Sequence, residues 1–133
     1  TVFRIYNATK DNMDQIQKQT NEAIGKMYAD NDYLMDTHTA VAYKVYEDYK
    51  AATGDDTPAV IASTASAYKF AESVANSIGI DGDMNGFEYI DAVNEKTGVR
   101  VPKGLKNLDK KEIRHKGVIE TDDMMKVVEQ SVK

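Results

Sequence analysis

The sequence predicts an α/β fold that is rich in helices and has few strands, and three observations support this prediction. Apolar residues recur at steps of three and four in several segments, as they do on the buried face of an amphipathic helix. Residues 59–62 (AVIA) form a brief, continuous apolar run after Pro58, which is typical of a strand covered on both faces. A β-prone run near the start offers a second strand. The 133 residues form one domain, or part of one, with room for a single core.

The expected elements follow one another along the chain with clear stop signals. Gly54, Gly79 and Gly98 each stand where an apolar stripe ends, which is where glycine commonly terminates a helix. Thr9 is a suitable N-cap for the first helix. We expect strands at about residues 2–6 and 59–63, and helices at about 9–28, 38–53, 66–78, 86–97 and 121–132.

Composition and charge exclude several classes of function. The chain carries 22 Asp and Glu against 17 Lys and Arg, a net charge of −5, so nucleic acid and anionic membranes are not expected partners. Without Cys it has no disulfide, no thiolate metal site and no Cys nucleophile, and a cytoplasmic location fits this composition. No apolar run is long enough to span a bilayer. The first residues lack both an initiator Met and the apolar core of a signal peptide, so we expect a processed chain or an excised segment.

The strongest local signal for a binding site is the hydroxyl-rich segment Ser63-Thr64-Ala65-Ser66. In open α/β sheets, ligands sit beyond the carboxyl end of a strand and near the next helix N-terminus. Hydroxyls both donate and accept hydrogen bonds, so they suit a heteroaromatic nitrogen or a phosphate oxygen. The structural alternative is that Ser66 caps its helix and the other hydroxyls satisfy backbone groups.

Lys69 and His38 are further candidates. Lys69 lies in the first helical turn, where a cation is disfavoured by the helix dipole unless an anion binds nearby; alternatively, it points into water. His38 opens the second helix, where a buried neutral histidine that fixes the helix start is favoured over a general base. A metal site is not expected, because His115 is remote in sequence and no Cys is present.

A possible calcium loop begins at Asp81. Asp81, Asp83, Asn85 and Gly86 match the opening D-x-D-x-N-G pattern of such loops. The twelfth position, which should supply a bidentate carboxylate, is Ala92. A polar turn capped by Asn85 explains the same residues, so calcium binding is the weaker interpretation.

Two segments resemble the C-terminal third of bacterial threonine synthase. Residues 33–43 (YLMDTHTAVAY) and 60–70 (VIASTASAYKF) are similar to the family patterns D-P-H-T-A-V and S-T-A-S-P-Y-K-F. The stretch from Gly86 to Lys116 also fits the C-terminal extension of that family. Thr37 and Ala67 depart from the family, each standing where Pro is common.

The resemblance implies a fragment of a tryptophan-synthase-β-like enzyme of fold type II that depends on pyridoxal phosphate. Such an enzyme converts O-phospho-L-homoserine and water to L-threonine and phosphate. Residues 1–79 would belong to the α/β part of the cofactor domain, and residues 80–133 to a mostly helical extension. The resemblance places Thr64 opposite the pyridine nitrogen of the cofactor, with Ser63 in support and with Lys69 and His38 as possible substrate or pocket residues.

The resemblance also implies missing parts. The Schiff-base lysine and the phosphate loop of the family lie upstream of anything that matches this sequence. We therefore expect no catalytic residue in this chain, no cofactor bound to it alone and no activity by itself. Its partners would be the remainder of the threonine synthase chain and the substrate. Exposed strand edges would also favour self-association.

Two alternatives come from other classes of protein. The first is a stand-alone, non-catalytic module for ligand binding or interaction whose resemblance is ancestral. The second is a calcium-responsive protein that uses Asp81, Asp83 and Asn85. A change in melting temperature with calcium would favour the second, because a ligand that binds only the native state raises its stability.

Overall fold

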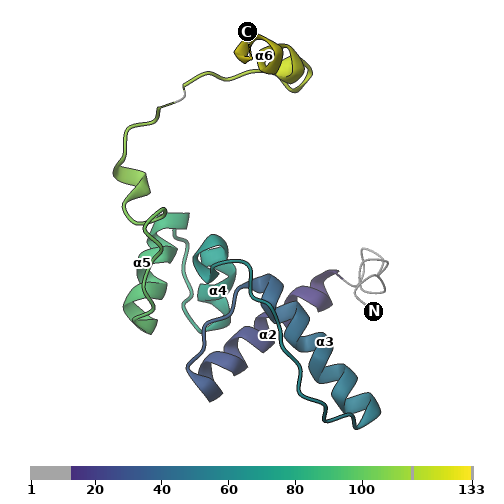
Figure 1. Cartoon of the computed structure of the whole chain (residues 1–133). Helices are drawn as coiled ribbons and strands as arrows, with labels where there is room; N and C mark the ends of the chain where they lie inside the picture. Colours follow the sequence, from purple (N-terminus) through teal and green to yellow (C-terminus); the bar gives the residue numbers. More distant parts are fainter. Residues whose placement is uncertain (1–12, 115, 133) are drawn as a thin grey trace.

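The computed structural model describes residues 13–114 and 116–132, and in these ranges every regular element is a helix. Figure 1 shows the helices labelled α2, α3, α4 and α5 gathered in one body, and α6 at the end of an extended arm. The elements are α2 (Met13–Asn31), α3 (Thr37–Thr53), η2 (Ala67–Phe70), α4 (Ala71–Ser77), α5 (Gly86–Thr97), η3 (Leu108–Lys110), η4 (Thr121–Asp123) and α6 (Met124–Ser131).

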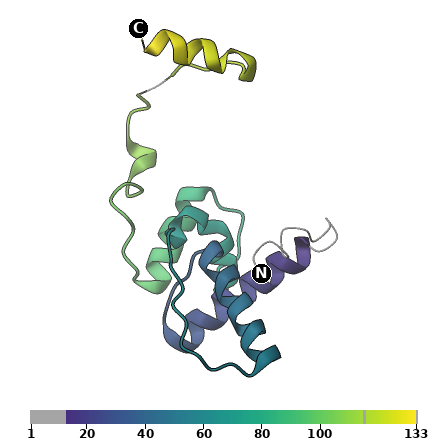
Figure 2. The same ribbon diagram turned by 45° about the vertical axis from the view of Figure 1, so that its right-hand side comes forward.

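The core lies where α4 packs between two neighbours. Helix α2 packs against α3 and against α4, and α4 packs in turn against α5. Ile24, Val74 and Val93, from α2, α4 and α5, are wholly buried, so apolar side chains from three helices meet in one cluster. Figure 2 shows α4 and α5 grouped beside the α2–α3 pair. The predicted single core is present: most of its buried residues lie on helices, and Met35 and Ile78 lie in the segments that follow α2 and α4.

The expected strand at residues 59–63 is wrong, because this segment is irregular in the structure. It crosses the surface between α3 and η2, and Val60 is 99% exposed. A strand needs neighbours to pair its backbone groups, and no described residue forms a ladder with this segment. The other expected strand, at residues 2–6, lies outside the described residues. Of the predicted α/β fold, only the high helix content is therefore confirmed in the described residues.

The expected helices are present: the one at 86–97 has the predicted limits, and the limits of the others are shifted. The helix expected at 9–28 is described from Met13 and continues to Asn31, its first residues lying outside the described part. The helix expected at 66–78 is two elements, the 3₁₀ turn η2 followed by α4, because the backbone of Phe70 between them (φ −125°, ψ 42°) is not helical. The last helix also begins as a 3₁₀ turn, η4.

Gly25 allows a close approach between α2 and α4. A Cβ at this position would lie 2.5 Å from the backbone oxygen of Ser77, the last residue of α4. No side chain fits at that distance unless a helix moves. Although glycine is a poor helix former, it lets these two helices touch at this point.

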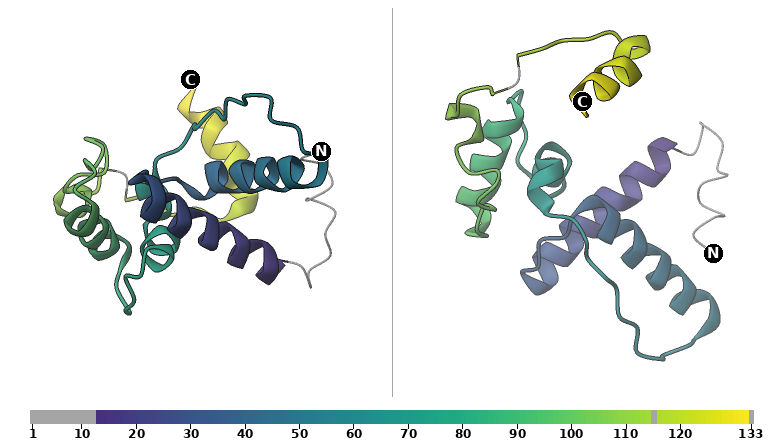
Figure 3. Two further views of the ribbon diagram at one scale, coloured as in Figure 1. Left: turned by 90° about the horizontal axis from the view of Figure 1, so that it is seen from below. Right: turned by 45° about the horizontal axis from the view of Figure 1, so that its top comes forward.

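The chain beyond α5 is an arm whose outer part is exposed. Val101 and Leu105 pack against the core, whereas Ile113, Val118 and Met125 are 70%, 95% and 69% exposed. Among the described elements, α6 packs substantially only against η4, the turn that precedes it. The right panel of Figure 3 shows the same separation from another direction.

None of the helices in the described ranges combines the length and the apolar character that crossing a membrane requires.

Candidate functional site: a carboxylate and hydroxyl corner at the start of α3

Asp36 organises the candidate site. It is the N-cap of α3, and its Oδ1 accepts hydrogen bonds from the backbone N–H groups of His38 (2.9 Å) and Thr39 (3.2 Å). A carboxylate suits this position because the first N–H groups of a helix have no partner within the helix. Asp36 is only 1% exposed, so the charge is held inside the protein by these donors.

Two hydroxyls complete the surroundings of the carboxylate. The Thr39 hydroxyl is hydrogen-bonded to Oδ2 of Asp36, and the Ser63 hydroxyl donates to the same oxygen at 3.3 Å. The hydroxyl oxygens of Thr39 and Ser63 are 3.0 Å apart. The network therefore ties the irregular segment before η2 to the first turn of α3.

Hydrogen bonding keeps the Asp36 carboxylate ionised. Burial by itself raises the pKa of Asp36, but hydrogen bonds from the side chain and backbone of Thr39, from the backbone of His38 and from the Ser63 hydroxyl outweigh burial. The net result is a pKa below the ordinary value of 3.8. At neutral pH the corner therefore carries a fixed negative charge surrounded by donors.

The three hydroxyls of the 63–66 segment have different surroundings. Ser63 belongs to the Asp36 network, and Ser66 caps η2 by accepting from the backbone N–H of Tyr68 at 3.3 Å. Thr64, which lies between them, is exposed. The predicted capping role of Ser66 is therefore confirmed, and the functional interpretation of Ser63 and Thr64 stays a prediction.

His38 and Lys69 are both exposed in the structure. The His38 side chain is 71% exposed, with Nδ1 3.6 Å from Oδ1 of Asp36 and its ring centroid 4.9 Å from that of Phe70. The expectation of a buried histidine is therefore wrong, although His38 does stand at the start of α3 as predicted. Lys69 is exposed at the end of η2.

The structure does not bring the four predicted residues into one cavity. His38 lines a cavity of about 490 Å³ beside α2 and α3, and Lys69 lines another of about 480 Å³ beside α5. Neither Ser63 nor Thr64 lines either of them. Their roles toward a cofactor or substrate stay predictions.

The residues of the possible calcium loop are used for other purposes. The side chain of Asn85 caps α5 by accepting from the backbone N–H groups of Phe87 (2.9 Å) and Glu88 (3.1 Å), and Glu88 accepts in return from the Asn85 N–H. Asp81 and Asp83 are exposed. Across residues 13–114 and 116–132, no three His, Asp or Glu side chains are grouped as a metal site would require.

Asp36 and Thr39 are the residues that sequence reasoning did not single out. Both stand inside the D-T-H-T segment, and an Asp immediately before a helical stripe is a recognisable N-cap signal. The contact with Ser63 crosses 24 residues of sequence, so no local pattern could reveal it.

The described residues define a helical domain that presents a hydroxyl-bearing segment beside the N-terminus of α3. Residues 39–132 match the family described as threonine synthase, C-terminal, and the chain belongs to this family. The match includes Ser63, Thr64 and Lys69, and it confirms the resemblance found in the sequence. No match is found among curated proteins.

Proposed function

We propose that this chain is the C-terminal part of a threonine synthase that uses pyridoxal phosphate to convert O-phospho-L-homoserine and water to L-threonine and phosphate. The observation that carries this proposal is the family match over residues 39–132, which contains the segment Ser63-Thr64-Ala65-Ser66. Residues 1–79 would contribute to the cofactor domain, and residues 80–133 would form the extension. The proposed location is the cytoplasm.

The exposed hydroxyl of Thr64 fits a pyridine nitrogen. A threonine hydroxyl is neutral and can donate one hydrogen bond, which a nitrogen lone pair accepts. Ser63 would hold the segment in position through Asp36 and Thr39, the contacts that the structure describes. When bound, the cofactor would withdraw electrons from the substrate carbon atoms, and a hydroxyl partner moderates this withdrawal because it leaves the nitrogen largely unprotonated.

The chain by itself would supply one wall of the site and no catalytic group. The amine that binds the cofactor covalently would come from the remainder of the enzyme, since no lysine here stands in a matching sequence context. His38 and Lys69 would then face the substrate or the pocket from this wall. Both are exposed in the structure, so a neighbouring part of the enzyme could cover them.

An assay of phosphate release tests the proposal. The isolated chain, mixed with pyridoxal phosphate and O-phospho-L-homoserine, is expected to release no phosphate above the protein-free background. A longer polypeptide that contains this chain and a lysine-bearing cofactor domain is expected to release phosphate and form threonine. Failure of the longer polypeptide with cofactor bound would contradict the function, and turnover by the isolated chain would contradict its inactivity.

A further inference from the structure

The segment that follows α5 concentrates positive charge on an acidic protein. Residues 99–116 carry seven of the 17 Lys and Arg residues and only two of the 22 Asp and Glu residues. The chain as a whole has a net charge of −5, so this segment is a basic part of an acidic chain. Four of its cations line a single cavity of about 220 Å³ against α5: Arg100, Lys103, Lys106 and Lys110.

The backbone that carries these cations is held by hydrogen bonds. The Asn94 side-chain amide, on α5, donates to the backbone oxygen of Val99 at 2.7 Å. The N–H groups of Leu105 and Lys106 both donate to the oxygen of Pro102, at 2.9 and 3.1 Å. The N–H group of Lys110 donates to the backbone oxygen of Asn107 at 3.2 Å and closes a further turn. Successive turns therefore place lysines three and four residues apart around one concavity.

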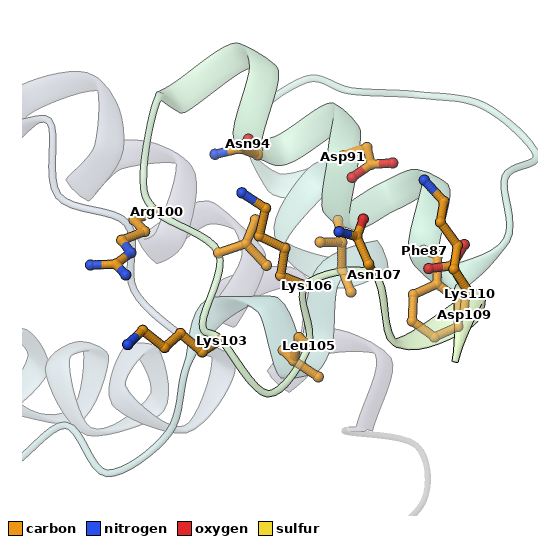
Figure 4. A pocket seen from close by; sticks show the side chains of 12 residues that line it. Phe87, Asp91, Asn94, Arg100, Lys103, Leu105, Lys106, Asn107, Asp109 and Lys110 are labelled. Atoms are coloured by element: carbon orange, nitrogen blue, oxygen red, sulfur yellow. The ribbon is translucent and has the colours of Figure 1, made fainter. Parts of the chain in front are cut away.

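The cations are not neutralised within the described part of the chain. None of the four forms an ion pair with another described residue. Figure 4 shows Arg100, Lys103 and Lys106 toward one end of the cavity, and Lys110 near Asp91 and Asp109 at the other. The first end is therefore purely cationic and the second is mixed.

An apolar floor lies beneath the cationic rim. Phe87 and Ile90 of α5, with Val101 and Leu105 of the arm, line the same cavity, and Ile90 is 8% exposed. A site with an apolar floor and a few charged groups at its rim is a common form of small-molecule site. The charge at the rim selects an anion, and the floor suits an apolar body attached to it.

We propose that the cavity between α5 and the 99–110 arm binds a small molecule that carries a phosphate group. The phosphate lies at the end formed by Arg100, Lys103 and Lys106, and the body of the molecule lies over Phe87 and Ile90. Arg provides a planar fork of donors and Lys a mobile point charge, and the two together suit a phosphate dianion. Because the cations are exposed, binding is weak and falls as salt is added.

This site is separate from the Ser63–Thr64 corner. The two share no lining or hydrogen-bonding residue, and the test below requires neither the cofactor nor turnover. Failure of the phosphate site and failure of the proposed enzymatic function are therefore distinguishable.

The test is a titration of the full 133-residue chain with inorganic phosphate and with phenyl phosphate, followed by amide chemical shifts. Each ligand is compared with sodium chloride at matched ionic strength. We expect saturable shifts at residues 99–110 with both phosphates and none with chloride. Phenyl phosphate is expected to bind more tightly, since its ring can cover the apolar floor; equal affinities would contradict the role of Phe87 and Ile90.

Charge variants test the assignment of the rim. Lys103→Ala and Lys106→Ala are each expected to weaken binding about fivefold, the effect of one charge near 4 Å in water-exposed surroundings. Asp109→Asn is expected to strengthen binding, because it removes a like charge from the cavity. The control Lys18→Ala changes an exposed lysine on α2 and is expected to have no effect. Shifts that chloride reproduces, or affinities that Lys103→Ala and Lys18→Ala change equally, would overturn the proposal.

Discussion

At the residue scale, the Asp36 carboxylate links the first turn of α3 to the segment that carries Thr64. It receives hydrogen bonds from two backbone N–H groups and from the hydroxyls of Thr39 and Ser63. A buried polar group is costly when its partners are lost, so each of these donors depends on the carboxylate. The sequence could indicate the helix cap, but the contact with Ser63 depends on the tertiary fold.

Replacing Asp36 should reveal this dependence. Asp36→Ala is expected to lower the free energy of unfolding by about 2–3 kcal/mol, because it removes the cap and leaves the two hydroxyls without their acceptor. Asp36→Asn keeps an oxygen for the backbone donors and is expected to cost about 1 kcal/mol or less. Urea unfolding at neutral pH measures both. If both variants lost the same small amount of unfolding free energy, the stabilising role of the Asp36 network would be contradicted.

The lowered pKa of Asp36 also predicts a pH dependence. Between the lowered pKa and the ordinary value of 3.8, the unfolded chain binds more protons at this residue than the folded chain does. The stabilisation from Asp36 is thus complete above the ordinary value and is lost as the pH falls through the lowered pKa. The stability difference between the native chain and Asp36→Asn should therefore be constant between about pH 7 and pH 5 and should shrink as the pH falls from about 5 to about 3. A difference that stays constant over this range would contradict the assignment.

At the element scale, the helices were predictable, whereas the strand expected at 59–63 is irregular in the structure. Helix stripes and their caps are local patterns, and Gly54 and Gly98 end α3 and α5 in the left-handed conformation as predicted. The apolar run at 59–62 resembles a strand only if other segments cover it, and Val60 is almost fully exposed here. Whether such a run becomes a strand depends on neighbours that a local pattern does not specify.

The contact of α2 with α4 offers a test of packing at this scale. Ala normally stabilises a helix by about 1 kcal/mol relative to Gly. Gly25→Ala is expected to have the opposite sign and to lower the free energy of unfolding by about 1–3 kcal/mol, because the new methyl group collides with the backbone of Ser77. Gly86→Ala, at the start of α5 with no atom within 4 Å, is the matched control and should be close to neutral. Stabilisation by Gly25→Ala in urea unfolding would contradict the close approach.

At the scale of the whole molecule, the described residues divide into a packed body and an exposed arm. The body contains the hydroxyl corner and the core, whereas Val118, Met125 and Val132 on the arm are at least two-thirds exposed. Apolar surface of this kind is typical of a region that another surface covers. In the proposed enzyme, the remainder of the chain would cover it.

Without that remainder, the arm is expected to promote self-association of the chain. Ending the chain after Lys110 removes Ile113, Val118 and the whole of α6. Sedimentation of the full chain at increasing concentration should show oligomers, and the shortened chain should stay monomeric at the same concentrations. Because the arm packs little against the body, helicity and unfolding of the body should be unchanged. A monomeric full chain at all concentrations would contradict this expectation.

The absorption spectrum of pyridoxal phosphate in the longer, lysine-bearing enzyme that contains this chain tests the central claim most directly. Thr64→Asp places a carboxylate where the hydroxyl is proposed to meet the pyridine nitrogen, so the nitrogen should become protonated, the cofactor band should shift and turnover should fall. Thr64→Ser keeps the hydroxyl and should retain both the native spectrum and most of the activity. A spectrum and a turnover rate that Thr64→Asp leaves unchanged would contradict the account.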